Sequence, residues 1–219
     1  MKLLLTSKGL RNETLRQVLR TLVGEEEISV AFIPTAANIV DSDKHWLVRD
    51  LSDARAMGRL DIIEIAALRE ADWRPRLEKA NVILFGGGNA VYLMHWLNAT
   101  GLAKALPELL TSRVYVGISA GSIVACPTLA ATSPEKVDEA RKRSIAVQAG
   151  LGLVPFWLRP HYNAPGWANA TSVATAELSK TIPGVLYGVD DESALQVIDG
   201  KVMVVGEGRC EKYEHGALR

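Results

Sequence analysis

The chain has 219 residues, in which 25 lysines and arginines balance 25 aspartates and glutamates. This length is typical of one domain whose core is large enough to fold without disulfides or structural metals. The balanced charge argues against binding to nucleic acid or to an anionic membrane surface. No apolar run approaches the roughly 18 residues of a transmembrane helix, and the N-terminus lacks the features of a signal peptide. We therefore expect a single cytoplasmic domain over residues 1–219.

The cysteines and histidines do not indicate a metal site. Cys126 and Cys210 form neither a disulfide framework nor a zinc-binding pattern, and the four histidines are widely dispersed along the chain. We expect both cysteines to be structural. The protein is expected to need no metal and no other cofactor.

Strand and helix patterns alternate through the first half of the chain. Short β-branched runs predict strands, and apolar residues at three- and four-residue spacing predict helices. A polar, charged segment over residues 70–79 separates the third and fourth strands. The predicted strands cover residues 3–6, 28–33, 61–66, 81–85 and 114–118, and the predicted helices cover residues 12–24, 41–58, 90–97 and the stretch from Ser119 towards Cys126.

The second half of the chain is less regular. Residues 128–144 are polar and are expected to form a loop with a short helix. The remaining expected elements are a strand within residues 151–158, a helix over 167–179, two strands within 185–198 that flank an acidic turn, a last strand over 202–205, and a polar tail through His215. The alternation predicts an α/β fold with a mostly parallel sheet and helices on both faces. Ligands then belong at the carboxyl ends of the strands.

One of these strand ends carries a Gly-x-Ser-x-Gly motif, from Gly117 to Gly121. A strand precedes the motif and a helix follows it, which is the context in which the serine of such a motif is pushed out of the sheet. Ser119 is then a candidate nucleophile, and the amide of Ala120 is a candidate donor to a developing oxyanion. The alternative is an ordinary glycine-rich turn.

A second unusual strand end carries three glycines, Gly86 to Gly88, before a helix. Their exposed amides suit an oxyanion or a phosphate group. The lysine and serine or threonine of a phosphate-binding P-loop are missing, and the glycine spacing does not match the dinucleotide-binding pattern. Oxyanion donation is the preferred interpretation, with phosphate binding and a plain tight turn as alternatives.

A catalytic serine needs a base that is held by a third group. His161 and His215 follow the serine in the sequence, whereas His45 and His95 lie in helical patterns and are interpreted as incidental. The acidic turn at residues 190–192 can supply the third group. Two arrangements follow from chemistry alone, one with His161 and one, in the residue order of an esterase or lipase, with His215.

Several segments together resemble the peptidase E family of aspartyl dipeptidases, which are relatives of cyanophycinase. The segments that carry the resemblance are Gly86 to Asn89, Gly117 to Ser122, Ala125 to Thr128, Pro160 to Tyr162 and Gly188 to Leu195. The resemblance implies a fold like that of the class I glutamine amidotransferases, which is flavodoxin-like. It also implies Ser119 as nucleophile, His161 as base, and the amides of Gly88 and Ala120 as oxyanion donors.

The third catalytic member of the family is a glutamate, and an ungapped match places it on Asp191, with Glu192 one residue later. Either acid is therefore a candidate. The candidate substrate-binding residues are Gly87, Asn89, Arg159 and Asn163.

Substrate selection departs from the family pattern. Peptidase E enzymes that prefer an N-terminal aspartate have an arginine about 14 residues beyond the catalytic histidine, but here no basic residue lies between His161 and Lys180. Losing such a partner for a buried carboxylate would cost about 2–5 kcal/mol. Arg159 could supply the charge from another direction, with Arg141 and Arg143 as weaker candidates, and a surface role for Arg159 stays open.

We therefore expect a serine peptidase that cuts short peptides after the first residue through an acyl-enzyme. The alternatives are a carboxylesterase that uses His215 and a non-catalytic homologue that binds peptides or small molecules. The expected partner is a short peptide substrate, without nucleic acid or membrane, and assembly as a homodimer is left open.

Overall fold

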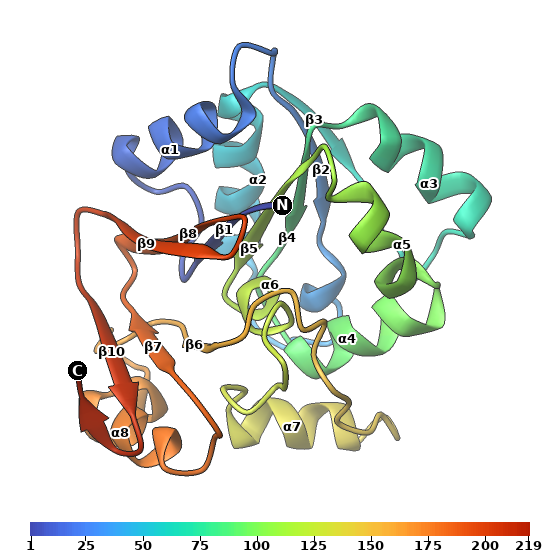
Figure 1. Cartoon of the computed structure of the whole chain (residues 1–219). Coiled ribbons are helices and arrows are strands. Elements are labelled where there is room, and N and C mark those ends of the chain that lie inside the picture. Colours follow the sequence, from blue (N-terminus) through green and yellow to red (C-terminus); the bar gives the residue numbers. More distant parts are fainter.

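A seven-stranded sheet runs through the computed structural model, which describes all residues from 1 to 219 (Figure 1). The strand order is β3-β2-β4-β5-β1-β8-β9; the first five strands in this order are parallel, and β8 and β9 add an antiparallel edge. The strands are β1 (Lys2–Thr6), β2 (Ser29–Ile33), β3 (Arg59–Ile62), β4 (Val82–Phe85), β5 (Val114–Ile118), β8 (Ser193–Ile198) and β9 (Lys201–Gly206). The predicted mostly parallel sheet is confirmed.

Helices cover both faces of this sheet (Figure 1). Successive side chains of a strand point to opposite faces, so Leu4 packs with helices α1 and α2, whereas Leu3 and Leu5 belong to the core beneath α3, α4 and α5. The helices are α1 (Glu13–Val23), α2 (His45–Met57), α3 (Glu70–Lys79), α4 (Ala90–Ala99), α5 (Leu102–Leu109), α6 (Ala120–Ile123), α7 (Pro134–Arg141) and α8 (Ser172–Ser179). None of them is long and apolar enough to cross a membrane.

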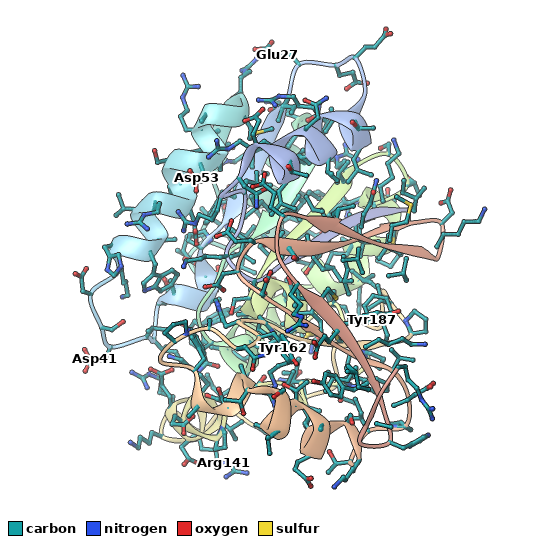
Figure 2. All side chains as sticks on the ribbon, turned by 90° about the vertical axis from the view of Figure 1, so that its left-hand side faces the viewer. Glu27, Asp41, Asp53, Arg141, Tyr162 and Tyr187 are labelled. Carbon is teal, nitrogen blue, oxygen red and sulfur yellow. The ribbon has the colours of Figure 1, made fainter.

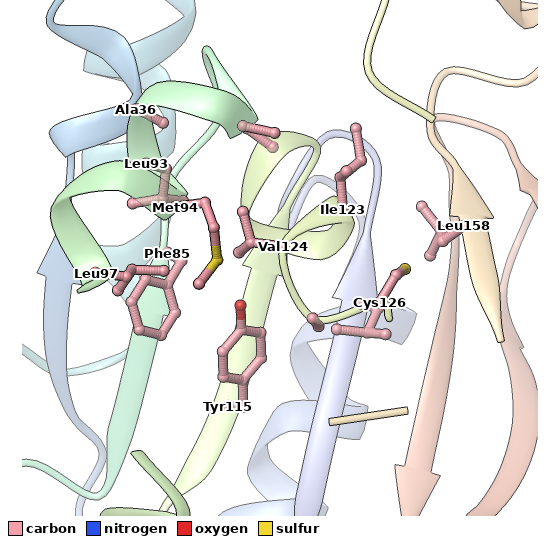
Figure 3. Close-up of a cluster of buried hydrophobic side chains, with 14 of the residues drawn as sticks. Ala36, Phe85, Leu93, Met94, Leu97, Tyr115, Ile123, Val124, Cys126 and Leu158 are labelled. Carbon is pink, nitrogen blue, oxygen red and sulfur yellow. The ribbon is translucent and has the colours of Figure 1, made fainter. Parts of the chain in front are cut away.

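The core beneath α4 supports the end of β5 (Figure 3). The rings of Phe85 and Tyr115 stack with their centroids 4.8 Å apart, and the Tyr115 hydroxyl donates a 2.6 Å hydrogen bond to the carbonyl of Gly121. Leu93 and Met94 close this cluster from α4. A buried hydrogen bond of this kind fixes the turn between β5 and α6 relative to the core.

A second sheet lies beside the first and has the strand order β11-β10-β7-β6. Its strands are β6 (Trp157–Arg159), β7 (Leu186–Val189), β10 (Cys210–Glu214) and β11 (Ala217–Leu218), and α8 packs against β7 and β10. The Ser7 hydroxyl donates a 2.7 Å hydrogen bond to the Val189 carbonyl, which joins the end of β1 to the end of β7. Tyr162, labelled in Figure 2, is buried, and its hydroxyl hydrogen-bonds that of Tyr213 at 2.6 Å.

Three expectations for individual elements were wrong. The strand expected at residues 61–66 is β3, which begins and ends earlier because Arg59 pairs with Ser29 and the chain leaves the sheet after Ile62. The carboxylate of Glu64 then accepts hydrogen bonds from the Thr35 hydroxyl and the Ala66 amide, which holds a turn there. The other two corrections are that the strand expected within residues 151–158 is only β6, which begins at Trp157 and ends at Arg159, and that the polar tail contains β10 and β11. The charged segment at residues 70–79 forms α3.

The helix expected at residues 167–179 is also divided. A 3₁₀ turn, η2 (Ala168–Ala170), precedes α8, and Thr171 lies between them in an extended conformation. The Thr171 hydroxyl accepts a hydrogen bond from the Ala174 amide and so caps α8. The chain therefore turns sharply before α8, and this turn belongs to the site described next.

Candidate active site

Ser119 lies in the sharp turn between β5 and α6, with a strained backbone at φ 48° and ψ −100°. Two glycines permit the turn, because a Cβ on Gly117 would lie 2.7 Å from the Gly121 backbone and one on Gly121 only 2.1 Å from the Phe85 carbonyl oxygen. The Ser119 amide donates a 2.9 Å hydrogen bond to the Thr6 carbonyl, which ties the turn to β1. Strain of this kind costs about 1–3 kcal/mol and occurs mostly at functional sites.

His161 lies beside Ser119, at the end of β6. It is 8% exposed and has a left-handed backbone with φ 57°. Its Nε2 lies 3.1 Å from Ser119 Oγ, and its Nδ1 lies 2.7 Å from Asp191 Oδ1. In the tautomer with the proton on Nδ1, the imidazole donates to Asp191 and accepts from the serine hydroxyl. The ends of β5, β6 and β7 thus bring together three side chains in the order needed for proton transfer.

Asp191 is held as a carboxylate. Burial alone would raise its pKa, but the hydrogen bond and charge of His161, together with Lys8, hold the pKa below its ordinary value. The second carboxylate oxygen lies 3.1 Å from Lys8 Nζ. Lys8 follows the end of β1, so a fourth strand end contributes to the same cluster.

The other two acids of the turn point elsewhere. The Glu192 carboxylate accepts a 3.1 Å hydrogen bond from the Asn12 side chain at the start of α1. The Asp190 carboxylate accepts hydrogen bonds from the backbone amides of Glu192 and Arg209. Of the two candidates for the orienting acid, Asp191 is therefore the one that contacts the imidazole.

Several backbone amides near Ser119 have no acceptor within the chain, and those of Gly88 and Ala120 are among them. The Ala120 amide is free because it begins α6, where the first amides of a helix have no partner inside the helix. Gly88 has φ +135°, and a Cβ there would lie 2.2 Å from the Ala36 carbonyl oxygen, so this position requires glycine. Free amides of this kind can donate to an anion at the serine.

Two cavities meet at Ser119. The smaller one has a volume of about 40 Å³ and the wider one about 700 Å³. Gly88, Ser119, Lys136 and Trp167 line both. The smaller cavity is also lined by Thr132, Ser133, Arg159 and Asn169, and the wider one by Lys8, Arg11, His45, Trp46, Arg49 and His161.

The smaller cavity contains a buried cation without an anion. Arg159 is 7% exposed, its Nη1 donates a 2.9 Å hydrogen bond to the Ala131 carbonyl, and its Nε has no partner. No carboxylate lies within ion-pair distance of its guanidinium. Burial lowers the pKa of Arg159 to about 10. The buried Thr132 hydroxyl on the same wall is also unpartnered, so this cavity offers donors to a ligand and no negative charge.

The remaining candidates for substrate binding are placed differently. Gly87 is near the serine, since a Cβ there would lie 3.8 Å from the Ser119 Cβ. Asn89 is fully buried, caps α4 by accepting from the Tyr92 amide, and donates to Lys136 and Glu139 of α7. Asn163 lines neither of the two cavities at Ser119.

The other histidines do not contact the serine. His45 is exposed at the start of α2 on the rim of the wider cavity, and His95 packs edge-on against Trp96 in α4. His215 is exposed in the turn between β10 and β11 and lines neither cavity. Of the two arrangements predicted from the sequence, the structure therefore provides side-chain contacts for the one in which His161 is the base.

The two cysteines are unpaired, and burial raises the pKa of both thiols to about 12. Such thiols are poor nucleophiles and poor metal ligands at neutral pH. No group of three or more histidine, cysteine, aspartate or glutamate side chains is arranged to hold a metal ion.

Comparison with known proteins matches residues 3–205 to the family model described as peptidase family S51. The chain belongs to this family. It is similar to peptidase E of a Nostoc species, with 29% identity over 92% of this chain and 82% of the relative, and to peptidase E of Streptomyces coelicolor, with 29% identity over 84% and 78%. The expected peptidase E resemblance is thus confirmed, and the S51 member described here is a serine peptidase.

Two solved structures share the fold. One is a Listeria monocytogenes protein provisionally described as peptidase E, with a TM-score of 0.76, 23% identity, and coverage of 94% of this chain and 98% of that one. The other is a peptidase from an acI-B1 actinobacterium, with a TM-score of 0.71, 22% identity, and coverage of 100% and 92%. Fourteen residues after His161, this S51 peptidase has Thr175, which is fully buried in α8 and lines neither cavity.

Sequence reasoning missed two residues of the site. Lys8 could have been found, because it lies two residues after a predicted parallel strand, and the carboxyl ends of parallel strands lie at one edge of the sheet. Trp167 stacks on His161, with ring centroids 4.0 Å apart and an angle of 13° between the planes. No sequence signal marks Trp167, because its position depends on the path of an irregular loop.

Proposed function

We propose that this S51 peptidase is a serine dipeptidase that releases an acidic N-terminal residue from short peptides. The observation that carries the proposal is the continuous contact from Ser119 through His161 to Asp191, beside two free backbone amides. A serine hydroxyl becomes a useful nucleophile only when a base in hydrogen-bond contact takes its proton.

In the proposed mechanism, Ser119 Oγ attacks the carbonyl carbon of the first peptide bond while His161 Nε2 takes its proton. The Gly88 and Ala120 amides donate to the resulting oxyanion. When the C–N bond breaks, His161 returns the proton to the leaving amine, and an acyl-enzyme remains on Ser119. Water, deprotonated by His161, then hydrolyses the ester. Asp191 holds the imidazole tautomer and stabilises the imidazolium in both steps.

The smaller cavity supports the choice of an acidic first residue. Arg159 and Thr132 both line it, and each carries a polar atom without a partner in the chain, so a substrate carboxylate is the proposed partner of these two side chains. Its volume of about 40 Å³ corresponds to roughly three or four water positions, which matches a short carboxylate side chain better than a large apolar one. The wider cavity, of about 700 Å³, then accepts the leaving residue with fewer limits on its side chain.

Hydrolysis of a dipeptide panel tests the proposal. Asp-Leu, Leu-Leu, Gly-Leu and a simple ester are each incubated with the wild type and with Ser119→Ala, and released amino acid or alcohol is measured. We expect Asp-Leu to be the best substrate and the variant to be inactive. Cleavage of Leu-Leu as fast as Asp-Leu would refute the acidic preference, and activity retained by the variant would refute the serine mechanism.

A further inference from the structure

One face of the catalytic-site imidazole is covered by a tryptophan. The Trp167 indole lies parallel to the His161 ring, with the centroids 4.0 Å apart and the planes inclined by 13°. Both edges of the imidazole are already occupied, by Ser119 at Nε2 and by Asp191 at Nδ1. The indole therefore contacts the ring where no hydrogen bond competes with it.

Trp167 is not held there by burial in the core. Its side chain is 41% exposed, which is unusual for so large an apolar group, and it lines both cavities at Ser119. The indole thus lies at the boundary between the smaller cavity, which Arg159 also lines, and the wider cavity. An exposed tryptophan in such a place lacks the packing role that explains most tryptophans.

The loop that carries Trp167 is closed at its base by Asn163. The Asn163 amide donates a 2.9 Å hydrogen bond to the Ala170 carbonyl, and its side-chain oxygen accepts a 2.8 Å hydrogen bond from the Ser172 amide. Asn163 has φ 55°, a left-handed conformation that asparagine tolerates better than most residues. Gly166, at φ +85°, allows the chain to turn just before the indole. These contacts hold the loop in a conformation that places the Trp167 indole against the His161 ring.

From this geometry we infer that Trp167 is a positioning residue for the proposed reaction: its indole fixes the plane of His161 and stabilises the imidazolium that forms when Ser119 loses its proton. The π face of an indole attracts a cation more strongly than that of any other side chain, and the imidazole gains a positive charge when it takes the proton of Ser119. An interaction that strengthens in the transition state raises kcat rather than substrate affinity. The inference rests on the proposed function of Ser119 and His161.

The size of the effect follows from cation–π contacts at partly exposed sites. Loss of the aromatic face should lower kcat about 3- to 30-fold and leave KM within about twofold. Phenylalanine at position 167 keeps an aromatic face, so Trp167→Phe should retain most of the wild-type kcat. Leucine covers the imidazole with an apolar side chain that has no aromatic face, so Trp167→Leu should show the full loss of kcat.

The test compares Trp167→Phe, Trp167→Leu and Trp167→Ala in steady-state hydrolysis of Asp-Leu. Trp46→Leu is the matched control, because Trp46 lines the wider cavity without stacking on His161. We expect kcat in the order wild type, Phe, Leu and Ala, with a smaller loss of kcat in Trp46→Leu than in Trp167→Leu. A rise in KM at constant kcat would overturn the inference, and so would equal losses of kcat in the phenylalanine and leucine variants or in the two leucine variants.

A second measurement separates this inference from the proposed substrate. The rate at which a fluorophosphonate labels Ser119 depends on the serine and its base and needs no peptide. If Ser119 is labelled in the wild type but no dipeptide is cleaved, the proposed substrate class is wrong. The inference about Trp167 is then still supported if Trp167→Leu is labelled more slowly than the wild type and Trp167→Phe is labelled at nearly the wild-type rate. Equal labelling rates in the wild type and all Trp167 variants would overturn it, as would a wild type that is not labelled. Thermal unfolding checks that each variant folds, and variants that unfold below the assay temperature are replaced by Asn163→Gly, which loosens the same loop and should also slow labelling.

Discussion

Replacing Arg159 by methionine should make the protein less selective and no less stable. The guanidinium is 7% exposed, and burial lowers its pKa from the ordinary, higher value of an arginine to about 10. A difference of this size corresponds to a cost of about 3 kcal/mol for keeping the charge buried without an anion. Methionine removes that cost and fills a similar volume, although the Ala131 carbonyl loses its 2.9 Å donor at a cost of about 1–3 kcal/mol.

The free energy of unfolding of Arg159→Met should therefore be unchanged or higher by about 1–2 kcal/mol, which raises the melting temperature by up to about 8 °C. The same change removes the proposed partner of the substrate carboxylate, a loss of about 2–5 kcal/mol of binding. We expect kcat/KM for Asp-Leu to fall at least about 30-fold, while kcat/KM for Leu-Leu does not fall.

Arg141→Met is the control for this experiment. Arg141 is exposed on α7, at the periphery of the molecule (Figure 2), and pairs only with Asp138 at 3.4 Å, a surface contact that contributes little. Neither melting temperature nor substrate preference should change. The reasoning would be refuted if Arg159→Met kept the wild-type ratio of Asp-Leu to Leu-Leu cleavage, or if it lost several kcal/mol of stability.

Four further substitutions test the assignment of the site residues. Asp191→Asn should lower kcat by about 10²–10⁴, because the wrong imidazole tautomer is then favoured, while Glu192→Gln should lower it less than about threefold. The pKa of Asp191 is held below its ordinary value, so the ionised carboxylate stabilises the fold fully above about pH 4. This stabilisation is lost as the pH falls through the lowered pKa. In urea unfolding, the free energy of unfolding of Asp191→Asn should therefore fall less between neutral and acidic pH than that of the wild type. Gly88→Ala should destabilise the protein by at least about 2 kcal/mol and remove most activity, since its Cβ would lie 2.2 Å from the Ala36 carbonyl oxygen, and a soluble, active variant would contradict this. His215→Ala should leave kcat/KM unchanged, and a large loss would favour the esterase-like arrangement instead.

The sequence was enough to predict the elements that are set by local pattern. The strand and helix around Ser119 follow from a β-branched run, two glycines and an apolar stretch, and the structure has β5 and α6 there, although α6 ends at Ile123, before the expected end near Cys126. Ser119, His161 and Asp191 do lie in contact, although the acid could not be chosen in advance because Asp191 and Glu192 are neighbours. Only the path of the chain after β7 turns Asp191 towards the imidazole and Glu192 towards Asn12.

What the sequence did not predict depends on contacts between distant segments. The tail around Tyr213 reads as polar, yet it forms β10 because it pairs with β7 and buries one side chain in a shared cluster with Tyr162. The roles proposed for Trp167 and Arg159 likewise depend on neighbours that lie far from them in the sequence, such as Ser119. A buried arginine and an exposed one look the same in a sequence, and only packing distinguishes them.

The acyl-enzyme itself is the most direct test of the account. An activated aspartyl ester is mixed with the wild type, quenched in acid during turnover, and the protein is digested and analysed by mass spectrometry. We expect an aspartyl group on the peptide that contains Ser119, absent in Ser119→Ala and in the wild type without substrate. Product formation with the aspartyl group on another residue, or formation that continues in Ser119→Ala, would contradict it.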